Sequence, residues 1–349
     1  MLTLAQVNSA KVMGERRQPP VEMEPTACLQ CSQNDEVRVI AATDPLNTPG
    51  GEFHIVRCRR CGLSYTNPRP TQASIGQFYP AEYSCHDLRS RESRSWRARW
   101  RRKMERAALR AYYSYPPQPA GLLPRLTGAW GRMAVRAPHR RTEWIPYRGE
   151  GRLLDFGCGA GAFLERMRSL GWRTEGIDVS AGVALAVQRQ KGIRVHVGTL
   201  PHPDLRNPSF DAITMWQALE HVHQPRETLR AAAALLHPGG LLLVSVPNFD
   251  SWSSARFGRN WFGLELPRHL THFTPATLRT MLAAEGFEVI KLETIGMDGW
   301  IRHSARRAVA AGRKLGHLAW KPLAQATARW TERHGHGDCL LALAERKTA

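Results

Sequence analysis

The sequence predicts an α/β protein whose main domain is a doubly wound, parallel sheet, preceded by a smaller domain that contains paired cysteines. From residue 153 onward, short apolar segments alternate with turns and helical segments. This alternation is typical of a parallel sheet with helices on both faces. The first apolar segment, 153–156, runs into a glycine-rich turn and a helix, as in nucleotide-binding folds. Upstream, two C-x-x-C pairs indicate a separate unit.

The predicted elements of the main domain have clear start and stop signals. Ser180 is a suitable N-cap, and Pro225 suits a first helical position. Thr274 and Pro275 open a further helix, which Gly286 ends. The predicted strands are residues 153–156, 174–178, 194–198, 212–216, 241–246, 287–293 and 339–344.

A chain of 349 residues predicts two or three domains of about 150 residues each. Residues 1–24 are polar, contain prolines and lack periodicity, so we expect a disordered lead. The ranges that follow are a four-cysteine domain at 25–84, a basic helical linker at 85–148, and the α/β domain at 149–349 with a basic helical insertion at about 297–337.

The four paired cysteines predict one structural zinc site. Cys28 and Cys31 form one knuckle, Cys58 and Cys61 form the other, and a strand-like segment at 37–40 lies between them. Four thiolates make a closed tetrahedral site for Zn²⁺ with no open position for water. The start of the chain has no apolar run like that of a signal peptide, and no apolar segment is long enough to span a membrane. We therefore expect a cytoplasmic protein whose paired cysteines bind metal instead of forming disulfides.

The net charge of +19 is concentrated in two segments. Residues 86–148 contain 16 Lys and Arg against 4 Asp and Glu, and residues 300–336 contain 8 against 1. Together these two segments account for the whole excess. Such local charge favours an anionic partner.

Both basic segments also have apolar faces at helical spacing. Three readings are open: helices that contact an anionic membrane, a lid that packs on the α/β domain, or phosphate contacts to nucleic acid, which would not use tryptophans. In the first segment the apolar face contains Trp96, Trp100 and Met104. In the second it contains Trp300, Ile301, Ala305, Ala308, Leu315 and Ala319, opposite Arg302, Arg306, Arg313 and Lys314.

A glycine-rich turn follows the first α/β strand, at Gly157, Gly159 and Gly161. Glycine lets a ligand approach backbone N–H groups and allows angles closed to other residues. The spacing also satisfies the dinucleotide pattern G-x-G-x-x-G/A, with Asp178 about 20 residues further on. Asp155 decides between the alternatives, because a carboxylate repels a pyrophosphate and attracts an ammonium group.

At these residues the chain resembles the class I S-adenosylmethionine-dependent methyltransferases. Their first motif, D-x-G-x-G-x-G after a strand, matches residues 155–161. Residues 176–178 resemble the end of their second strand, 210–222 the fourth strand with the helix start after it, and 236–247 the fifth strand with its turn. The resemblance covers about residues 150–295 and roughly the last ten. It implies a Rossmann-like sheet whose last two strands form an antiparallel pair.

The resemblance also implies how S-adenosylmethionine binds. Asp155 would meet its ammonium group, and Asp178 would accept hydrogen bonds from both ribose hydroxyls. Leu200 would line the adenine, although Gly198 and Thr199 stand where family members often have an acid. The full predicted set, at the carboxyl ends of the strands, is Asp155, Gly157, Gly159, Gly161, Asp178, Leu200, Trp216 and Gln217.

Methyl transfer from a sulfonium mainly requires alignment of the acceptor, and a base only when the acceptor must lose a proton. Three histidines are candidates for this base: His221, His269 and His272. For His221 a helix-capping or packing role is an equal alternative. A divalent metal held by Glu220, His221 and His272 is a further alternative, because some RNA 2'-hydroxyl methyltransferases use a comparable set. Gln217 stands where that group has another acid.

A narrower resemblance concerns the acceptor. Some bacterial methyltransferases that act on sugars and surface glycans have a four-cysteine zinc-ribbon domain in front and a run similar to C-G-L-S-Y at 61–65. Residues 78–83 also resemble that group, and Tyr79 and Tyr83 either reach the active site or pack at a domain junction. The resemblance implies a small-molecule sugar or a lipid-linked glycan as acceptor, with peripheral contact at the inner face of the membrane. The alternatives are an RNA methyltransferase, a nucleic-acid-binding zinc-ribbon protein and, less favoured, an NAD-dependent oxidoreductase.

Overall fold

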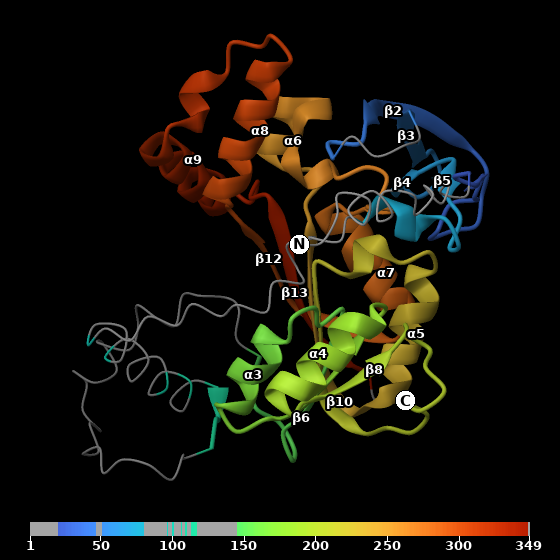
Figure 1. Ribbon diagram of the computed structural model, residues 1–349, viewed down its shortest axis with the longest axis vertical. Coiled ribbons are helices and arrows are strands. Elements are labelled where there is room, and N and C mark those ends of the chain that lie inside the picture. Colours follow the sequence, from blue (N-terminus) through green and yellow to red (C-terminus); the bar gives the residue numbers. More distant parts are fainter. Residues whose placement is uncertain are drawn as a thin grey trace, which may run out of the picture.

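A seven-stranded sheet and a four-stranded sheet form the framework of the described chain (Figure 1). Most of the basic linker predicted at 85–148, with Met104, lies outside the described residues, and so does most of the lead predicted at 1–24. The predicted domain boundaries stay a prediction. The computed structural model describes residues 20–46, 51–79 and 145–347, and between them residues 113–116 with Trp96, Trp100, Arg106 and Leu109.

The larger sheet is made of β6 (Arg152–Phe156), β7 (Arg173–Asp178), β8 (Arg194–Val197), β9 (Phe210–Trp216), β10 (Leu236–Pro247), β12 (Phe287–Ile295) and β13 (Cys339–Arg346). Their order is β12-β13-β10-β9-β6-β7-β8. The strands from β10 to β8 are parallel, whereas β13 pairs antiparallel with both β10 and β12. The predicted fold class and its antiparallel last strands are therefore confirmed. The strand order reverses between β6 and β9, and open α/β sheets bind ligands at the carboxyl ends of such strands.

Helices cover both faces of this sheet. One face carries α3 (Ala162–Arg168) and α4 (Ala181–Lys191), and the other carries α5 (Pro225–Leu235) and α7 (Pro275–Ala284). Successive strand residues point to opposite faces. In β6, Leu153 packs in the core beneath α3 and α4, and Leu154 packs in the core beneath α5 and α7.

The helix starts follow the predicted signals. The Ser180 side chain caps the first turn of α4, and Pro225 is the first residue of α5. Thr274 and Thr277 form a reciprocal capping box at the start of α7. One feature differs from the prediction: the turn expected at 236–240 lies within the bounds of β10, where the pairing with β9 is irregular.

The smaller sheet combines strands from distant parts of the chain. Its strands are β2 (Glu36–Thr43), β3 (Glu52–Cys58), β4 (Ser64–Thr66) and β11 (Thr271–His272), in the order β11-β4-β3-β2. Three of them belong to the N-terminal unit, the name used here for residues 20–46 and 51–79. The unit also contains the pair β1 (Met23–Glu24) and β5 (Arg69–Pro70) and the short helix η2 (Ile75–Phe78). The fourth strand, β11, comes from the α/β region and pairs antiparallel with β4.

The predicted basic insertion contains α8 (Asp298–Ala310), η8 (Gly316–Ala319) and α9 (Lys321–Arg333). The apolar face predicted between Trp300 and Ala319 does not lie on a single helix. Helix α8 ends at Ala310, and Gly312 turns the chain with a φ of 80°. Ile301, Ala305 and Ala308 are completely buried against neighbouring helices, which include α6 (Trp252–Phe257). This packing agrees with the lid alternative for the segment.

The N-terminal unit shares its hydrophobic cores with the rest of the protein. Tyr65 packs in the same buried cluster as Leu278 of α7. On the other side, Phe53 and Phe78 pack in the cluster that contains Ile301 of α8. In Figure 1 the blue strands of the unit lie beside α7 and on the same side of the molecule as α6, α8 and α9. The unit therefore packs against both α7 and the insertion.

Candidate active site

The turn after β6 brings three glycines close to neighbouring elements. Gly157, Gly159 and Gly161 have φ angles of 73°, 47° and 68°, in the region that favours glycine. A Cβ atom at Gly157 would lie 2.8 Å from the Cβ of Ala218. One at Gly161 would lie 2.8 Å from Cγ1 of Val187. The turn is thus closed to larger residues, as expected of a loop whose backbone contacts a ligand.

Asp155 lies at the end of β6, directly before this turn, and is 2% exposed. Its Oδ1 accepts a hydrogen bond from the Thr214 hydroxyl at 2.6 Å. Burial raises the pKa of Asp155 to about 7. The hydrogen bond from Thr214 lowers this pKa, and the negative charge of Asp178 raises it further. A cation beside this carboxyl would favour its ionised form. The position suits an ammonium group.

Asp178 ends β7, and both of its carboxylate oxygens accept backbone hydrogen bonds. Oδ2 accepts from the N–H of Gly159 at 2.9 Å, and Oδ1 accepts from the N–H of Ser180 at 2.9 Å. These bonds hold the carboxylate between the glycine turn and the start of α4. Each oxygen has a second lone pair, so Asp178 can accept hydrogen bonds from a pair of hydroxyls.

The remaining predicted cofactor residues differ in their surroundings. The Trp216 ring packs 5.3 Å from that of Phe163, and its buried Nε1 has no hydrogen-bond partner among the described residues. Gln217 has a φ of 49°, and its side-chain amide donates to Ser245 Oγ at 3.1 Å. Leu200 packs in the core that contains α5 and is 3% exposed. Its contact with adenine stays a prediction.

The predicted histidines lie where the N-terminal unit meets the segments after β9 and β10. The rings of His221 and His269 pack edge to face with centroids 4.6 Å apart. The His272 ring packs against Phe249 at 5.3 Å. Burial lowers the pKa of all three, that of His221 to about 3. All three rings are therefore neutral at pH 7, and the same burial makes each ring a weaker proton acceptor than a free imidazole.

Tyr79 of the N-terminal unit reaches the first of these histidines. Its hydroxyl oxygen lies 2.9 Å from His221 Nδ1, which is also 3.1 Å from the carbonyl oxygen of Arg268. We assign the proton of His221 to Nδ1, where it can be donated to this carbonyl, and the lone pair to Nε2; a donating Tyr79 hydroxyl would require the other tautomer. Tyr79 thus contacts the histidine cluster, and Tyr83 lies outside the described residues.

Thr66, at the end of β4, contacts the other two histidines. Its Oγ1 lies 2.7 Å from the carbonyl oxygen of His269 and 3.2 Å from Nε2 of His272. The hydroxyl has one proton and donates it to the carbonyl, so Nε2 of His272 must donate to Thr66. His272 therefore has its lone pair at Nδ1.

A buried ion pair next to the histidines joins the N-terminal unit to the α/β region. The sequence did not predict this ion pair. Arg268 is fully buried and donates to both carboxylate oxygens of Asp44 at 2.8 and 3.1 Å. It also donates to the carbonyl oxygen of Phe78 at 2.9 Å and to Glu265 Oε1 at 3.2 Å. Arg268 directly precedes His269 in the sequence, but nothing in one sequence pairs it with an acid 224 positions away.

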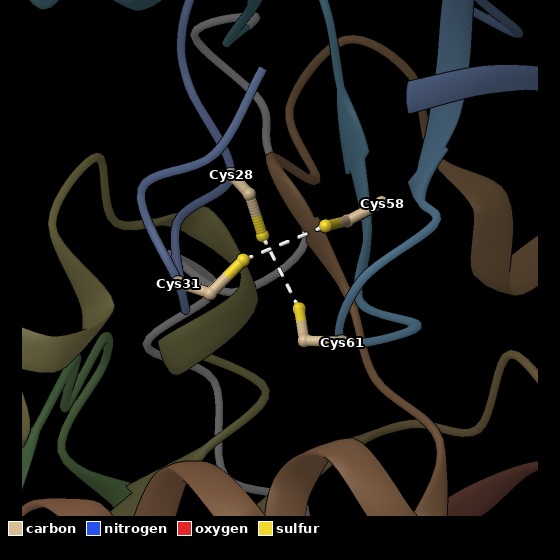
Figure 2. Close-up of side chains that lie close together, drawn as sticks. All are labelled: Cys28, Cys31, Cys58 and Cys61. Carbon is tan, nitrogen blue, oxygen red and sulfur yellow. Dashed lines mark hydrogen bonds between the residues drawn. The ribbon is translucent and has the colours of Figure 1, made fainter. Parts of the chain in front are cut away.

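The four predicted zinc ligands converge on one point (Figure 2). The sulfur atoms of Cys28 and Cys61 are 3.4 Å apart, those of Cys31 and Cys58 are 3.5 Å apart, and all four are free thiols. Sulfur ligands at about 2.3 Å from one tetrahedral zinc ion lie about 3.8 Å from one another. The sulfur spacing therefore fits a four-cysteine zinc site.

The alternative metal set with His272 differs from the arrangement in the structure. Glu220, His221 and His269 each place one possible ligand atom within 4.8 Å of the others. His269 thus stands in this group where the sequence suggested His272. The reason is the fold around β11, in which His272 points to Thr66.

Comparison with known proteins gives a consistent family. The methyltransferase domain family matches residues 95–292. The ubiquinone biosynthesis O-methyltransferase of Xanthomonas axonopodis pv. citri (strain 306) is 31% identical over 195 residues, which cover 52% of this chain and 80% of that protein. The protein of the same name from Burkholderia thailandensis is 30% identical over 156 residues, which cover 41% of this chain and 67% of that protein.

Solved structures are similar at lower identity. An S-adenosylmethionine-dependent methyltransferase from Mesorhizobium loti has a TM-score of 0.41 and 22% identity, covering 58% of this chain and 94% of that chain. One from Archaeoglobus fulgidus has a TM-score of 0.42 and 17% identity, covering 70% and 94%. The family match itself spans more than half of the chain and includes the glycine turn, Asp155 and Asp178. The chain therefore belongs to the methyltransferase domain family, and it is a class I S-adenosylmethionine-dependent methyltransferase.

Proposed function

We propose that the enzyme methylates a hydroxyl group of a sugar, either as a small molecule or as part of a lipid-linked glycan. The observation that carries this proposal is the group of three neutral, buried histidines between the sheet and the N-terminal unit. A hydroxyl loses its proton when it is methylated, and a neutral imidazole can take that proton. The relatives named above are O-methyltransferases, which supports a hydroxyl acceptor.

In this proposal the glycine turn and two acids hold the cofactor. Asp155 receives the ammonium group, since it is a buried carboxyl with one hydrogen bond from a side chain. The free lone pairs of Asp178 receive the ribose hydroxyls. Trp216 Nε1 lacks a partner among the described residues and can donate to a further acceptor atom of the ligand.

His272 is the general base in this proposal. Its Nε2 proton is used by Thr66, which leaves the lone pair at Nδ1 for the acceptor. His269 lies instead beside Glu220 and His221, with one ring nitrogen within 4.8 Å of a possible ligand atom of each. Its Nδ1 donates to the carbonyl oxygen of Gly263 at 3.0 Å, and its Nε2 lies 3.6 Å from Glu265 Oε2.

Aromatic side chains near the histidines support a sugar acceptor. Phe249 packs between His272 and Trp261, with centroid distances of 5.3 and 6.4 Å, and Trp261 packs 6.3 Å from Trp300. Because the relatives are ubiquinone biosynthesis O-methyltransferases, a second candidate acceptor is a hydroxyl of a ubiquinone precursor.

The proposal assigns a structural role to the four cysteines. One Zn²⁺ held by Cys28, Cys31, Cys58 and Cys61 orders the N-terminal unit, and a closed four-thiolate site leaves no position for catalysis. The unit carries Thr66 and Tyr79, so this zinc keeps both side chains at the histidines. The zinc therefore supports the active site from outside it.

We propose that the exposed tryptophans of the basic segments, and not the buried apolar face of α8, contact an anionic membrane surface. Trp96, Trp100 and Trp320 are 67%, 61% and 66% exposed, and basic residues lie close to them in the sequence. Exposed tryptophans and arginines together suit the membrane interface. Among the described residues, none of the helices has the length and apolar composition needed to cross a bilayer. The contact would be peripheral.

Product analysis tests the function directly. The protein is incubated with S-adenosylmethionine carrying a labelled methyl group and with sugars, lipid-linked glycans, ubiquinone precursors and RNA. Label on a sugar hydroxyl that falls by about 10² to 10⁴ in His272→Asn supports the proposal. Label on RNA alone overturns it. Co-sedimentation with anionic vesicles tests the membrane contact, which should weaken in Trp320→Ala and be absent with neutral vesicles.

A further inference from the structure

Glu220 is a buried acid in the segment that follows β9. It lies in the short helix η5 (Leu219–His221) and is 0% exposed. Within the described residues, neither of its carboxylate oxygens has a hydrogen-bond partner. A buried carboxylate in such surroundings is costly unless a cation compensates it.

Two imidazole rings lie next to this carboxyl group. With its proton assigned to Nδ1, His221 donates to the carbonyl oxygen of Arg268 at 3.1 Å, and His269 donates its Nδ1 proton to that of Gly263 at 3.0 Å. Each ring therefore has its lone pair at Nε2. Metal-binding histidines are usually held in this way, with the other ring nitrogen bonded to a carbonyl or carboxylate.

The lone pair of His269 is not used by a neighbouring acid. Its Nε2 lies 3.6 Å from Oε2 of Glu265, which is too long for a hydrogen bond. The other oxygen of Glu265 accepts from Arg268 Nε at 3.2 Å. Glu220, His221 and His269 each place one possible ligand atom, a carboxylate oxygen or a ring nitrogen, within 4.8 Å of the other two.

We propose that Glu220, His221 and His269 bind one divalent transition-metal ion, at a site separate from the four cysteines. Two imidazoles and one carboxylate suit Zn²⁺, Mn²⁺, Co²⁺ or Fe²⁺, whereas Mg²⁺ and Ca²⁺ prefer oxygen ligands. Ligands bound at about 2.1 Å from one ion lie at most about 4.2 Å apart, so a small contraction closes the site. The ion supplies a positive charge next to Glu220, which compensates the charge of its buried carboxylate.

Three protein ligands leave coordination positions open. An acceptor hydroxyl bound there would have a lower pKa and be easier to deprotonate. This role in catalysis rests on the function proposed above, whereas metal binding itself does not. The two are therefore measured separately.

Zinc stoichiometry of the full-length protein tests the site. Equilibrium dialysis against Zn²⁺ should give two bound ions per chain for the wild type and one for Glu220→Gln and for His269→Asn. Glu293→Gln is the control, because Glu293 lies on β12 and one of its oxygens has no hydrogen-bond partner among the described residues. It should keep two ions. Glutamine preserves the shape of Glu220, so the fold should survive, as circular dichroism will check.

Cobalt shows which site is lost. Co²⁺ bound by thiolates has sulfur-to-metal charge-transfer bands, and a site of nitrogen and oxygen ligands has none. Glu220→Gln should keep these bands while losing one ion. Equal stoichiometry in wild type and Glu220→Gln, at one or at two ions, would overturn the proposal. Calorimetry with S-adenosylmethionine on the same proteins reports on the proposed function independently of the metal count.

Discussion

Asp44 and Arg268 form a bidentate ion pair that is buried from solvent, with N–O distances of 2.8 and 3.1 Å. Asp44 belongs to the N-terminal unit, and Arg268 directly precedes His269. Two charges in such a place compensate each other, but one of them alone is strongly unfavourable. The ion pair therefore links the position of the N-terminal unit to that of the histidines.

Removing one member of this pair should destabilise the protein. We expect Arg268→Met to lower the free energy of unfolding by about 3 to 5 kcal/mol, because Asp44 stays buried without a cation. The double variant Asp44→Leu/Arg268→Met should recover part of this loss. Arg59→Met is the control, since the Arg59 and Asp35 side chains are 62% and 64% exposed and their pair should contribute little. Urea denaturation measures all four proteins, and similar losses for Arg268→Met and Arg59→Met would refute the expectation.

The pKa of Asp155 predicts a pH-dependent stability. Burial raises this pKa to about 7, so the folded protein binds a proton that the unfolded chain has lost above about pH 4. The stabilising contribution is fully present below that pH and is lost as pH rises through 7, by roughly 4 kcal/mol at most. The buried histidines act in the opposite direction. Denaturation should therefore measure the free energy of unfolding of wild type and of Asp155→Asn from pH 4 to pH 8. If the difference between the two free energies stays constant over this range, the prediction is wrong.

Cofactor binding should depend on the same proton. An ammonium group beside Asp155 favours the carboxylate, so S-adenosylmethionine should release a proton on binding below pH 7. Affinity should then rise by up to about tenfold per pH unit between pH 6 and 7. Calorimetry in buffers of different ionisation enthalpy counts the released proton. Asp155→Asn should bind weakly without this pH dependence, and wild-type binding without proton release would show that the ammonium group lies elsewhere.

The glycine turn should not accept a side chain at its first position. In Gly157→Ala the new methyl group would lie 2.8 Å from the Cβ of Ala218, at a φ of 73°. We expect at least a tenfold loss of cofactor affinity and a destabilisation of about 1 to 2 kcal/mol. Gly182→Ala is the matched control: nothing lies within 4 Å of its Cβ position in α4, and alanine there should stabilise the helix slightly. Wild-type cofactor affinity in Gly157→Ala would mean that the turn can relax.

The Tyr79 hydroxyl should affect turnover and not cofactor binding. Tyr79→Phe removes the group that lies 2.9 Å from His221 Nδ1 and keeps the ring. A lost hydrogen bond of this kind corresponds to about a 5- to 10-fold fall in turnover. The affinity for S-adenosylmethionine should stay unchanged, since the Tyr79 hydroxyl contacts His221, a histidine that is not among the predicted cofactor residues. Tyr147→Phe, whose hydroxyl donates to an exposed backbone carbonyl, serves as control and should be fully active.

Most of the larger sheet could be predicted from the sequence because its signals are local. The alternation of apolar strands and helices, the caps at Ser180 and Thr274 and the glycines at 157–161 all act within a few residues. The two acids at consecutive strand ends could be placed for the same reason. Parallel neighbouring strands bring their carboxyl ends to one edge of the sheet.

The contacts around the histidines could not be predicted in this way. Thr66 and His272 are 206 positions apart, and their hydrogen bond depends on the pairing of β4 with β11. Helical spacing identified the apolar face around Ile301, but spacing alone does not distinguish a face that packs on protein from one that meets lipid. Such distinctions depend on which segments meet in three dimensions.

The pairing of β4 with β11 also has a consequence for the order in which the protein can fold during synthesis. All four cysteines leave the ribosome about 200 residues before Thr271, which at normal rates of translation is roughly 10 to 40 s earlier. Throughout that interval one edge of β4 has no partner strand, and open strand edges promote aggregation. Metal capture by the nascent chain is therefore not enough to complete this sheet. A fragment that ends before residue 271 would keep every cysteine ligand and still lack the strand that closes the edge.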